Sequence, residues 1–269
     1  MSSEGTGRTI VHIKTGKRKV LITFDDNKTL LLSYDAFTDQ PLYEGKECTD
    51  EEWKALTVLA DEDKLRNIAL RFVTKEPHTR HEVIQFLYKK GANEKTAYRI
   101  VAQLEDLKLI NDEMYADIYA KDAAGIKLLG RNKILSNLKE KGIGDEILSR
   151  IHFDEERELS KARRYASMAN KKFATSTNTK KMYKVIDALL RRGFDEDVAR
   201  EAARLEFTAG DPELELQRLR KDAIRTRARF IKRFSGYELK RRVWAALARK
   251  GYPFESIDAV MKELEDEDF

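Results

Sequence analysis

Residues 88–94 read YKKGANE, and the glycine at their centre decides the fold because it stands where a helix must end. Glycine readily adopts the left-handed conformation that closes a helix, and lysines in the last turn complement the carbonyl end of the helix dipole. The pattern returns as LKEKGIGDE at 138–146, LLRRGFDED at 189–197 and LARKGYPFE at 247–255. Successive glycines are 51, 51 and 58 residues apart. Such regular spacing predicts a repeated supersecondary unit.

Each copy carries the same apolar stripe ahead of its glycine. A leucine lies four residues before the glycine, and a branched aliphatic residue lies eight residues before it. Positions i, i+4 and i+8 share one side of a helix, so we expect these residues to be buried. The leucines are Leu87, Leu138, Leu189 and Leu247, and the branched residues are Val83, Ile134, Val185 and Val243.

The length of the repeat predicts its architecture. About fifty residues accommodate three helices of ~12–15 residues with short connections. Units of this size bury their apolar faces by packing on their neighbours. Thr79–Glu82 and Ser235–Glu238 have capping-box spacing, and a Gly-Asp-Pro break at 210–212 accounts for the longer third interval. We therefore expect a mainly helical fold of tandem three-helix repeats in an elongated curved array, with repeats at 61–112, 113–156, 157–210 and 211–269, the last ending in an acidic tail.

The first sixty residues differ from the repeats. RTIVHIK, KVLITF and TLLLSY, between residues 8 and 34, are rich in β-branched and aliphatic residues and are separated by turn-forming residues. They predict three short strands of a small antiparallel sheet. Thr49–Glu52 has capping-box spacing and predicts a helix through Trp53 and Leu56. We expect a β-rich N-terminal domain at 1–60, which serves either as a partner contact or as a cover for the first repeat.

Composition limits the class of protein. The sequence has 269 residues, a net charge of +5 and a 37% content of charged residues, which indicates extensive solvated helix surface. It has neither an apolar run long enough to span a bilayer nor a secretion signal at MSSEGTGRTI. Cys48 is the only cysteine, so no intrachain disulfide forms. We expect a monomer in the reducing cytoplasm, without membrane contact.

The sequence contains no pattern typical of an enzyme. Gly16-Lys17 lacks the upstream glycine and the following Ser or Thr of a phosphate-binding loop. His78 and His81 are three residues apart without a third metal ligand nearby, which favours surface or capping roles. Paired carboxylates such as Asp112-Glu113 suit helix caps and solvated faces. We expect no catalytic residue, no metal ion and no cofactor.

The carboxyl-terminal half is the best candidate for function. Residues 156–255 carry 26 basic and 14 acidic side chains, and residues 217–250 alone hold 13 basic residues. Such a concentration suits a polyanion, because neutralising phosphates releases counterions. The alternative is a solvated face that the acidic tail partly offsets. The candidate residues for filament or nucleic-acid binding are Arg218, Arg220, Lys221, Arg225, Arg227, Arg229, Lys232, Arg233, Lys240, Arg241, Arg242, Arg249 and Lys250.

The glycine-ended helices, together with the stretch LEDLKLINDEMYADIYAKD at 104–122, resemble the RecX family of bacterial regulators of the RecA recombinase. In that family a leucine-rich helix runs into an acidic-aromatic junction between three-helix units. The resemblance covers about residues 62–266, and the N-terminal strands resemble an extension of longer, Gram-positive-type members. The residues that fit the junction are Leu104, Leu107, Leu109, Ile110, Asp112, Tyr115, Ala116 and Tyr119.

The resemblance implies a non-enzymatic regulator. Such a protein binds the RecA–DNA filament and inhibits its ATPase, strand-exchange and SOS co-protease activities, and thereby modulates homologous recombination and DNA repair. The implied partners are the RecA filament and single-stranded DNA, with double-stranded DNA as a further candidate. Two other readings stay open from the residues: a free-standing helical DNA-binding protein or transcription factor, and a passive scaffold.

Overall fold

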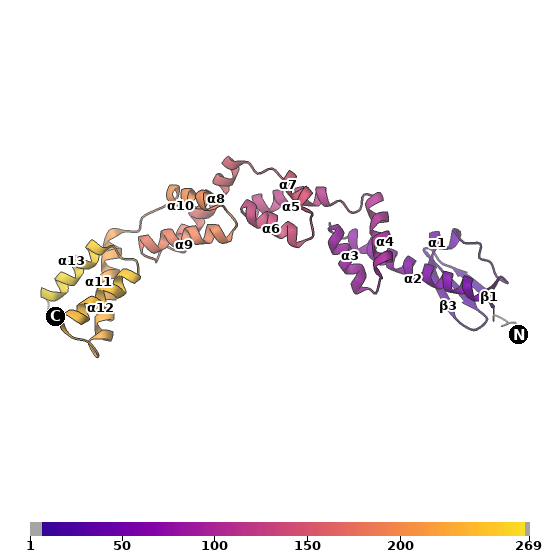
Figure 1. Ribbon diagram of the computed structural model, residues 1–269, viewed down its shortest axis with the longest axis horizontal. Coiled ribbons are helices and arrows are strands. Elements are labelled where there is room, and N and C mark those ends of the chain that lie inside the picture. Colours follow the sequence, from indigo (N-terminus) through magenta and orange to yellow (C-terminus); the bar gives the residue numbers. More distant parts are fainter. Residues whose placement is uncertain (1–6, 267–269) are drawn as a thin grey trace. The chain divides into compact units, whose positions relative to one another are not determined.

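The computed structural model describes residues 7–266, and it begins with a four-stranded antiparallel sheet in the order β3-β2-β1-β4 (Figure 1). The three predicted strands are confirmed. The sequence did not predict β4 or the short helix α1, which follows directly after β3. The elements are β1 Arg8–Thr15, β2 Lys19–Phe24, β3 Thr29–Ser33, α1 Tyr34–Thr38 and β4 Glu47–Cys48.

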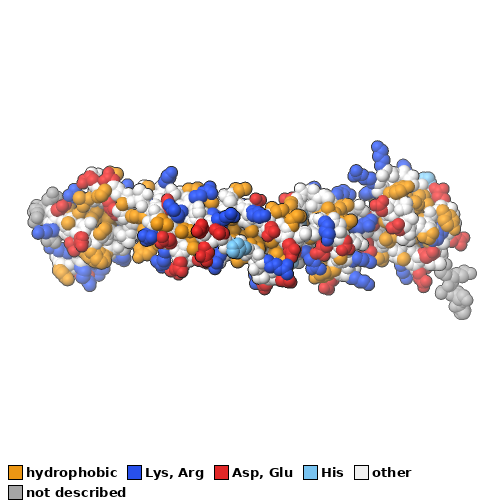
Figure 2. All heavy atoms as spheres, turned by 90° about the horizontal axis from the view of Figure 1, so that it is seen from above, with side chains coloured by type: hydrophobic (Ala, Val, Ile, Leu, Met, Phe, Trp, Pro, Cys, Tyr) orange, Lys and Arg blue, Asp and Glu red, His pale blue; other side chains and the backbone are white. Residues whose placement is uncertain are grey.

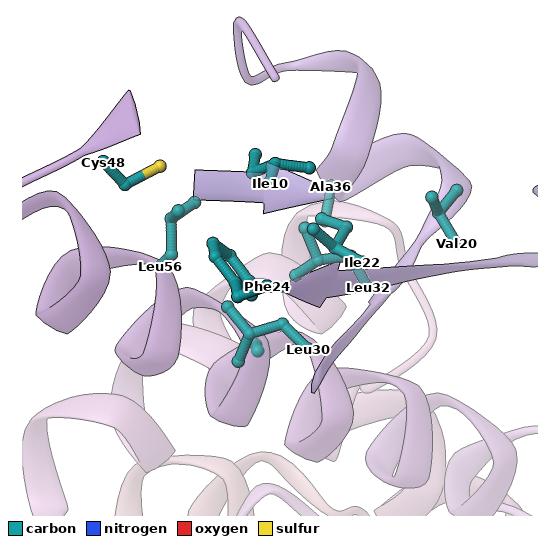
Figure 3. Packing of buried hydrophobic residues seen from close by; sticks show 10 residues of the cluster. Ile10, Val20, Ile22, Phe24, Leu30, Leu32, Ala36, Cys48 and Leu56 are labelled. Carbon is teal, nitrogen blue, oxygen red and sulfur yellow. The ribbon is translucent and has the colours of Figure 1, made fainter. Parts of the chain in front are cut away.

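One face of the sheet packs against helix α2, Asp50–Val73. Figure 3 shows Phe24 and Leu30 of the sheet beside Leu56 of α2. The ring of Trp53 meets that of Phe24 edge-on, with 4.8 Å between the centroids. Cys48 lies in the same core, where burial raises the pKa of its thiol. The predicted capping box of α2 is present, with both hydrogen bonds between Thr49 and Glu52.

A buried carboxylate holds the sheet to α2. Asp63 is 6% exposed. Its carboxylate accepts hydrogen bonds from the backbone N–H of Ser33 at 2.5 Å and from the Ser33 hydroxyl at 2.7 Å. On its own helix it also accepts from Arg66 at 2.9 Å and Asn67 at 3.0 Å. Because Ser33 ends β3 and caps α1, Asp63 joins a helix, a strand and a helix start.

Replacing Asp63 by alanine should therefore lower the free energy of unfolding of the sheet and α2 by about 2–3 kcal/mol, since it leaves the half-buried Ser33 donors without their acceptor. The exposed neighbour Asp61 provides the control, and Asp61→Ala should leave stability unchanged. Urea unfolding would be followed by Trp53 fluorescence in a Trp244→Phe background, which leaves one tryptophan. Equal midpoints for the two variants would contradict this account of the anchor.

From residue 50 onward the described chain is helical, as the sequence predicts. The helices that follow α2 are α3 Arg80–Lys89, α4 Glu94–Asp106, α5 Asp112–Gly125, α6 Arg131–Glu140, α7 Asp145–Arg150, α8 Glu155–Lys172, α9 Asn178–Arg191, α10 Glu196–Leu205, α11 Pro212–Phe230, α12 Gly236–Arg249 and α13 Phe254–Asp266.

Three groups of three consecutive helices each enclose a hydrophobic core: α2–α4, α8–α10 and α11–α13. In each group the glycine-ended helix is the second. Every predicted stripe residue is at most 1% exposed, in these groups and in α6 alike, which confirms the helical spacing. These residues are Val83, Leu87, Ile134, Leu138, Val185, Leu189, Val243 and Leu247.

The helix order bears on the proposed repeat boundaries. The chain divides into two compact units, Met1–Ala116 with Glu140–Ile147 and Asp117–Lys139 with Leu148–Phe269. Helix α2 continues across residue 60, whereas α5, α8 and α11 begin within two residues of the expected repeat starts. The boundaries remain a proposal, with helix order favouring repeats that start at α2, α5, α8 and α11. Residues 267–269 of the acidic tail lie outside the described residues.

The four repeated glycines all end their helices in the left-handed conformation, with φ between +82° and +89°. After α3 the N–H of Ala92 donates to the carbonyl of Leu87 at 3.1 Å, and the N–H of Gly91 donates to that of Tyr88 at 3.0 Å. This pair of bonds is the Schellman motif, which satisfies the last carbonyls of a helix. The predicted stop is therefore confirmed.

Three of these stops also join one repeat to the previous one. The residue before the glycine offers its carbonyl to the start of the preceding glycine-ended helix. The Thr79 hydroxyl donates to Lys141 O at 2.7 Å, and the Thr177 hydroxyl donates to Lys250 O at 3.1 Å. At the middle junction the Gly130 N–H donates to Arg192 O at 2.9 Å. The motif thus ends a helix and builds a junction with the same few residues.

The cation before the glycine contributes to these junctions too. Lys141 Nζ donates to Glu82 Oε1 at 2.5 Å. Burial disfavours both charges, but the hydrogen bond between them, with those to Tyr115 and from the Thr79 N–H, outweighs it, so that the pKa of Lys141 is raised and that of Glu82 is lowered. The guanidinium of Arg192 lies over the ring of Tyr165, 4.5 Å from its centroid. Part of the basic-basic-glycine pattern is therefore structural.

One predicted cap is wrong in detail. Thr79 forms the expected capping box with Glu82, but the Ser235 side chain makes no capping hydrogen bond at the start of α12. The Glu238 carboxylate accepts instead from Arg241 at 3.0 Å and from Arg242 at 2.7 Å. Ser235 and Glu238 have the spacing of a capping box, but two arginines on the following turn bind the Glu238 carboxylate instead.

The described residues contain neither a candidate membrane span nor a candidate metal site. No helix within residues 7–266 combines the length and the apolar character that a membrane span needs. Within the same residues, no three His, Cys, Asp or Glu side chains are grouped so that they could hold a metal ion. His78, expected in a surface or capping role, is partly buried, and its ring is stacked on Phe72 with 3.7 Å between the centroids.

Candidate functional site

The basic segment folds into α11, α12 and the turn between them. Helix α11 begins at Pro212 with Asp211 as N-cap, so the Gly-Asp-Pro break is the end of a loop and the start of a helix. Its buried face consists of Leu219, Ala223 and Thr226. Because that face packs into the α11–α13 core, the arginines on the remaining faces are directed to solvent or to the edges of α12 and α13.

Four of the thirteen candidate cations gather around one groove. This α11–α12 groove has a volume of about 370 Å³. Small side chains form its floor, which leaves the space open between the longer cations on the two helices. The lining residues are Arg225, Thr226 and Arg229 of α11 and Ala246, Arg249 and Lys250 at the end of α12.

One of the four cations is held by a carboxylate. Lys250 Nζ lies 2.8 Å from Asp222 Oδ1, and the Tyr252 hydroxyl donates to Asp222 Oδ2 at 3.0 Å. Burial raises the pKa of Asp222, but the hydrogen bonds from Lys250 and Tyr252 outweigh it and lower that pKa. Burial, together with its bond to Asp222, raises the pKa of Tyr252. Lys250 is therefore a fixed part of the wall.

The other three cations of the groove form no ion pair with a carboxylate within the described part of the chain, although the charge of Arg225 contributes to the lowered pKa of Asp222. Arg225, Arg229 and Arg249 are exposed. The Arg229 guanidinium lies 4.7 Å from the centroid of the Phe230 ring, and Arg249 Nε donates to the carbonyl of Ala245 at 3.2 Å. These contacts orient the guanidinium groups without neutralising them. The groove consequently offers three guanidinium groups without a carboxylate ion pair to an anionic ligand.

Several other candidates are already ion-paired. Arg220 binds Glu263 of α13 at 3.0 Å. Arg241 and Arg242 share Glu238, and the Arg241 hydrogen bond is the main cause of the lowered pKa of that carboxyl. Helix packing gives Arg220 its partner, whereas Arg241 and Arg242 pair within their own helix, three and four residues from Glu238.

The remaining candidates lie outside the groove. Arg218, Lys221, Lys232 and Arg233 are exposed, and Lys232 and Arg233 follow the end of α11. Arg227 and Lys240 are partly buried. Lys240 and Arg241 line a second groove between α12 and α13, together with Tyr237 and Trp244. The thirteen candidates therefore do not gather at one site, since four line the α11–α12 groove, two line the second groove and the other seven line neither.

Acidic side chains also interrupt the basic surface. On the face of the molecule drawn in Figure 2, Lys and Arg side chains alternate with Asp and Glu side chains in both units. Net charge alone thus predicts little about where a polyanion binds. The groove stands out because its three free arginines converge on one space.

Comparisons with known proteins relate the whole chain to one family. The family model "RecX, third three-helix domain" matches residues 213–261, which span most of α11–α13. "Regulatory protein RecX" of Streptococcus gordonii is 26% identical over 259 residues, which cover 94% of this chain and 98% of that protein. Its namesake in Streptococcus pneumoniae is 28% identical over 261 residues, with the same coverage.

Solved structures agree with these relatives. A crystal structure of regulatory protein RecX superposes with a TM-score of 0.63 at 21% identity, covering 73% of this chain and 98% of that chain, and shows the fold. The crystal structure of RecX from Lactobacillus salivarius gives a TM-score of 0.50 at 28% identity, covering 54% of this chain and 96% of the other. From the matched domain, the full-length relatives and the shared fold, it follows that the chain belongs to the RecX family of regulatory proteins.

Proposed function

We propose that this protein is a cytoplasmic, non-enzymatic regulator of the RecA recombinase. It binds the RecA–DNA filament and inhibits ATP hydrolysis, strand exchange and the co-protease activity that triggers the SOS response. Membership of a regulatory family supports the general role. The observation that carries the proposed contact is the α11–α12 groove, which lies within the segment matched by the family model.

The groove suits an anionic surface of the filament. Arg225, Arg229 and Arg249 present bidentate donors, and arginine recognises both phosphates and carboxylates in this way. Their partner is either the DNA held in the filament or an acidic surface of the recombinase. Several modest contacts along one chain raise the overall affinity through effective concentration.

The function is tested by adding the pure protein to recombinase assembled on single-stranded DNA and following ATP hydrolysis. We expect inhibition at well below one protein per recombinase monomer, because one chain is expected to span several protomers. No inhibition at any ratio would contradict the proposed function. A discrete protected sequence in footprints on duplex DNA would favour a transcription factor instead.

The groove is tested by the triple substitution Arg225→Gln, Arg229→Gln and Arg249→Gln. At least about ten times more protein should be needed for half-maximal inhibition, and the salt dependence should weaken, because three anion contacts are lost. The matched control replaces Arg191, Arg200 and Arg204, which are exposed but bind acids on their own helices. Indistinguishable curves for the two triple variants would rule out the groove as the contact.

A further inference from the structure

The hairpin between β1 and β2 carries an unusual concentration of charge at the opposite end of the sequence. Four of the six residues in KTGKRK, 14–19, are basic: Lys14, Lys17, Arg18 and Lys19. All four are exposed. Within residues 7–266 none of them lies within ion-pair distance of a carboxylate. We refer to these four residues as the cationic hairpin.

The other cations of the sheet are neutralised. Arg8 binds Asp26 at 2.9 Å and Asp50 at 3.0 Å, and Lys28 binds Asp26 at 3.2 Å. Asp26 lies in the turn between β2 and β3, at the far end of β2 from the cationic hairpin. Charge is therefore separated along β2: Asp26 and its basic partners lie at one end, and four cations without an ion pair lie at the other.

The nearby carboxylate of Glu44 binds residues of β1 and not the hairpin cations. Glu44 accepts the backbone N–H of Ile13 at 2.7 Å and lies 3.0 Å from His12 Nδ1. The bond from Ile13 is the main cause of the lowered pKa of Glu44. This acid is adjacent to the strand that leads into the hairpin, yet it is oriented by β1 rather than by the hairpin lysines.

The hairpin is held in a defined shape. Lys14 is paired across the strands with Leu21, and Thr15 with Val20. The Gly16 N–H donates to the carbonyl of Lys19 at 2.8 Å. The four charges are thus mounted on a paired ribbon, so less conformational entropy is lost when they bind a ligand than for lysines on a flexible segment.

An exposed aromatic residue adjoins the hairpin through its backbone. The Tyr34 N–H donates to the carbonyl of Arg18 at 3.3 Å, which places the first residue of α1 against the hairpin. Tyr34 is 50% exposed. Cations that follow a sugar-phosphate backbone, next to an aromatic ring on which a base stacks, are the usual elements of single-strand binding.

We propose that the cationic hairpin and Tyr34 form a binding site for single-stranded nucleic acid. Lys14, Lys17, Arg18 and Lys19 contact the phosphates, and a base stacks on Tyr34. This site is independent of the proposed action on the recombinase, and it gives the N-terminal sheet a role of its own. It also gives the chain a second polyanion contact, on a different unit from the α11–α12 groove.

The test measures the binding of the full chain to a fluorescein-labelled thymidine 30-mer without recombinase, by anisotropy at several salt concentrations. The variant replaces Lys14, Lys17, Arg18 and Lys19 by glutamine. Because each single-strand phosphate contact contributes about 0.7 to the slope of log K against log salt, we expect the slope to decrease by about 2–3. Circular dichroism verifies that each variant is folded.

The matched control removes the same charge from exposed, unpaired lysines of the same unit, by Lys54→Gln, Lys64→Gln, Lys75→Gln and Lys95→Gln. The slope for this control should stay close to that of the unsubstituted protein. This result would show that the effect of the hairpin variant comes from a local site and not from the lower net charge. Equal slopes for the hairpin variant and the unsubstituted protein, or no binding of the 30-mer by the latter, would overturn the proposal.

A second substitution tests the aromatic contact. Tyr34→Ala should weaken binding of the 30-mer at least about fivefold, whereas Tyr34→Phe should retain it, because stacking needs the ring and not the hydroxyl. If the hairpin variant loses affinity only for assembled filaments and binds the free 30-mer normally, the hairpin contacts protein, and the nucleic-acid site is refuted. The 30-mer assay contains no recombinase, so its result does not depend on whether the protein inhibits the filament ATPase.

Discussion

Replacing Gly193 by alanine is expected to destabilise the protein by about 2–5 kcal/mol. With φ at +84°, a residue with a Cβ pays about 1–2 kcal/mol for the left-handed conformation. A Cβ here would also lie 2.3 Å from the backbone nitrogen of Lys133 and 2.5 Å from its Cβ. Overpacking of this kind adds about 1–3 kcal/mol, because a backbone at the start of α6 moves less easily than a side-chain tip.

Gly91→Ala is the matched control for this prediction. Gly91 has φ at +89°, but nothing lies within 4 Å of the Cβ position. Only the conformational cost of about 1–2 kcal/mol should remain. The difference between the two variants in denaturant unfolding therefore isolates the junction between repeats.

Hydrogen exchange would locate the effect. The amide of Gly130 donates to Arg192 O at 2.9 Å, and that of Asn132 donates to Gly193 O at 3.0 Å. Both amides should exchange faster in the Gly193 variant and normally in the Gly91 variant. Equal losses of stability with unchanged exchange at these amides would show that the junction is not the source of the cost.

Leu189→Ala is the second substitution with a large expected effect. The side chain is fully buried in the α8–α10 core, so its truncation leaves a cavity and should cost about 2–5 kcal/mol. The next residue provides the control: Leu190 is 42% exposed, and Leu190→Ala should cost less than about 1 kcal/mol. Both substitutions remove the same atoms from adjacent positions of one helix.

The comparison needs a readout within that bundle, which contains no tryptophan. Hydrogen exchange of the α8–α10 amides at increasing denaturant gives the local free energy of opening. Similar values for the two leucine variants would contradict the burial assigned to the stripe, and with it the helical register on which the repeat interpretation depends.

Local features were predictable because they depend on near neighbours in the chain. The left-handed glycines, the buried positions four and eight residues before them and the capping boxes at Thr49 and Thr79 all follow from helical spacing. The three longer strands followed from their β-branched runs. Two-residue β4 has no such signal, since its pairing with Arg8 and Thr9 depends on a contact about forty residues away.

By itself the sequence determined that the chain is a series of helices ended by glycine after a small sheet, because helix periods and glycine stops are set within a few residues. Only the tertiary structure decided which cations remain unneutralised. Arg225 and Arg249, more than twenty residues apart, meet in a groove, whereas Arg220 is neutralised by Glu263 of another helix. The tertiary structure also showed that the repeated glycines lie at junctions between repeats. A Cβ at Gly193 would overlap Lys133, sixty residues away in the sequence. Both outcomes depend on how the helices pack. Helical periodicity does not reveal which side chains of distant segments come into contact.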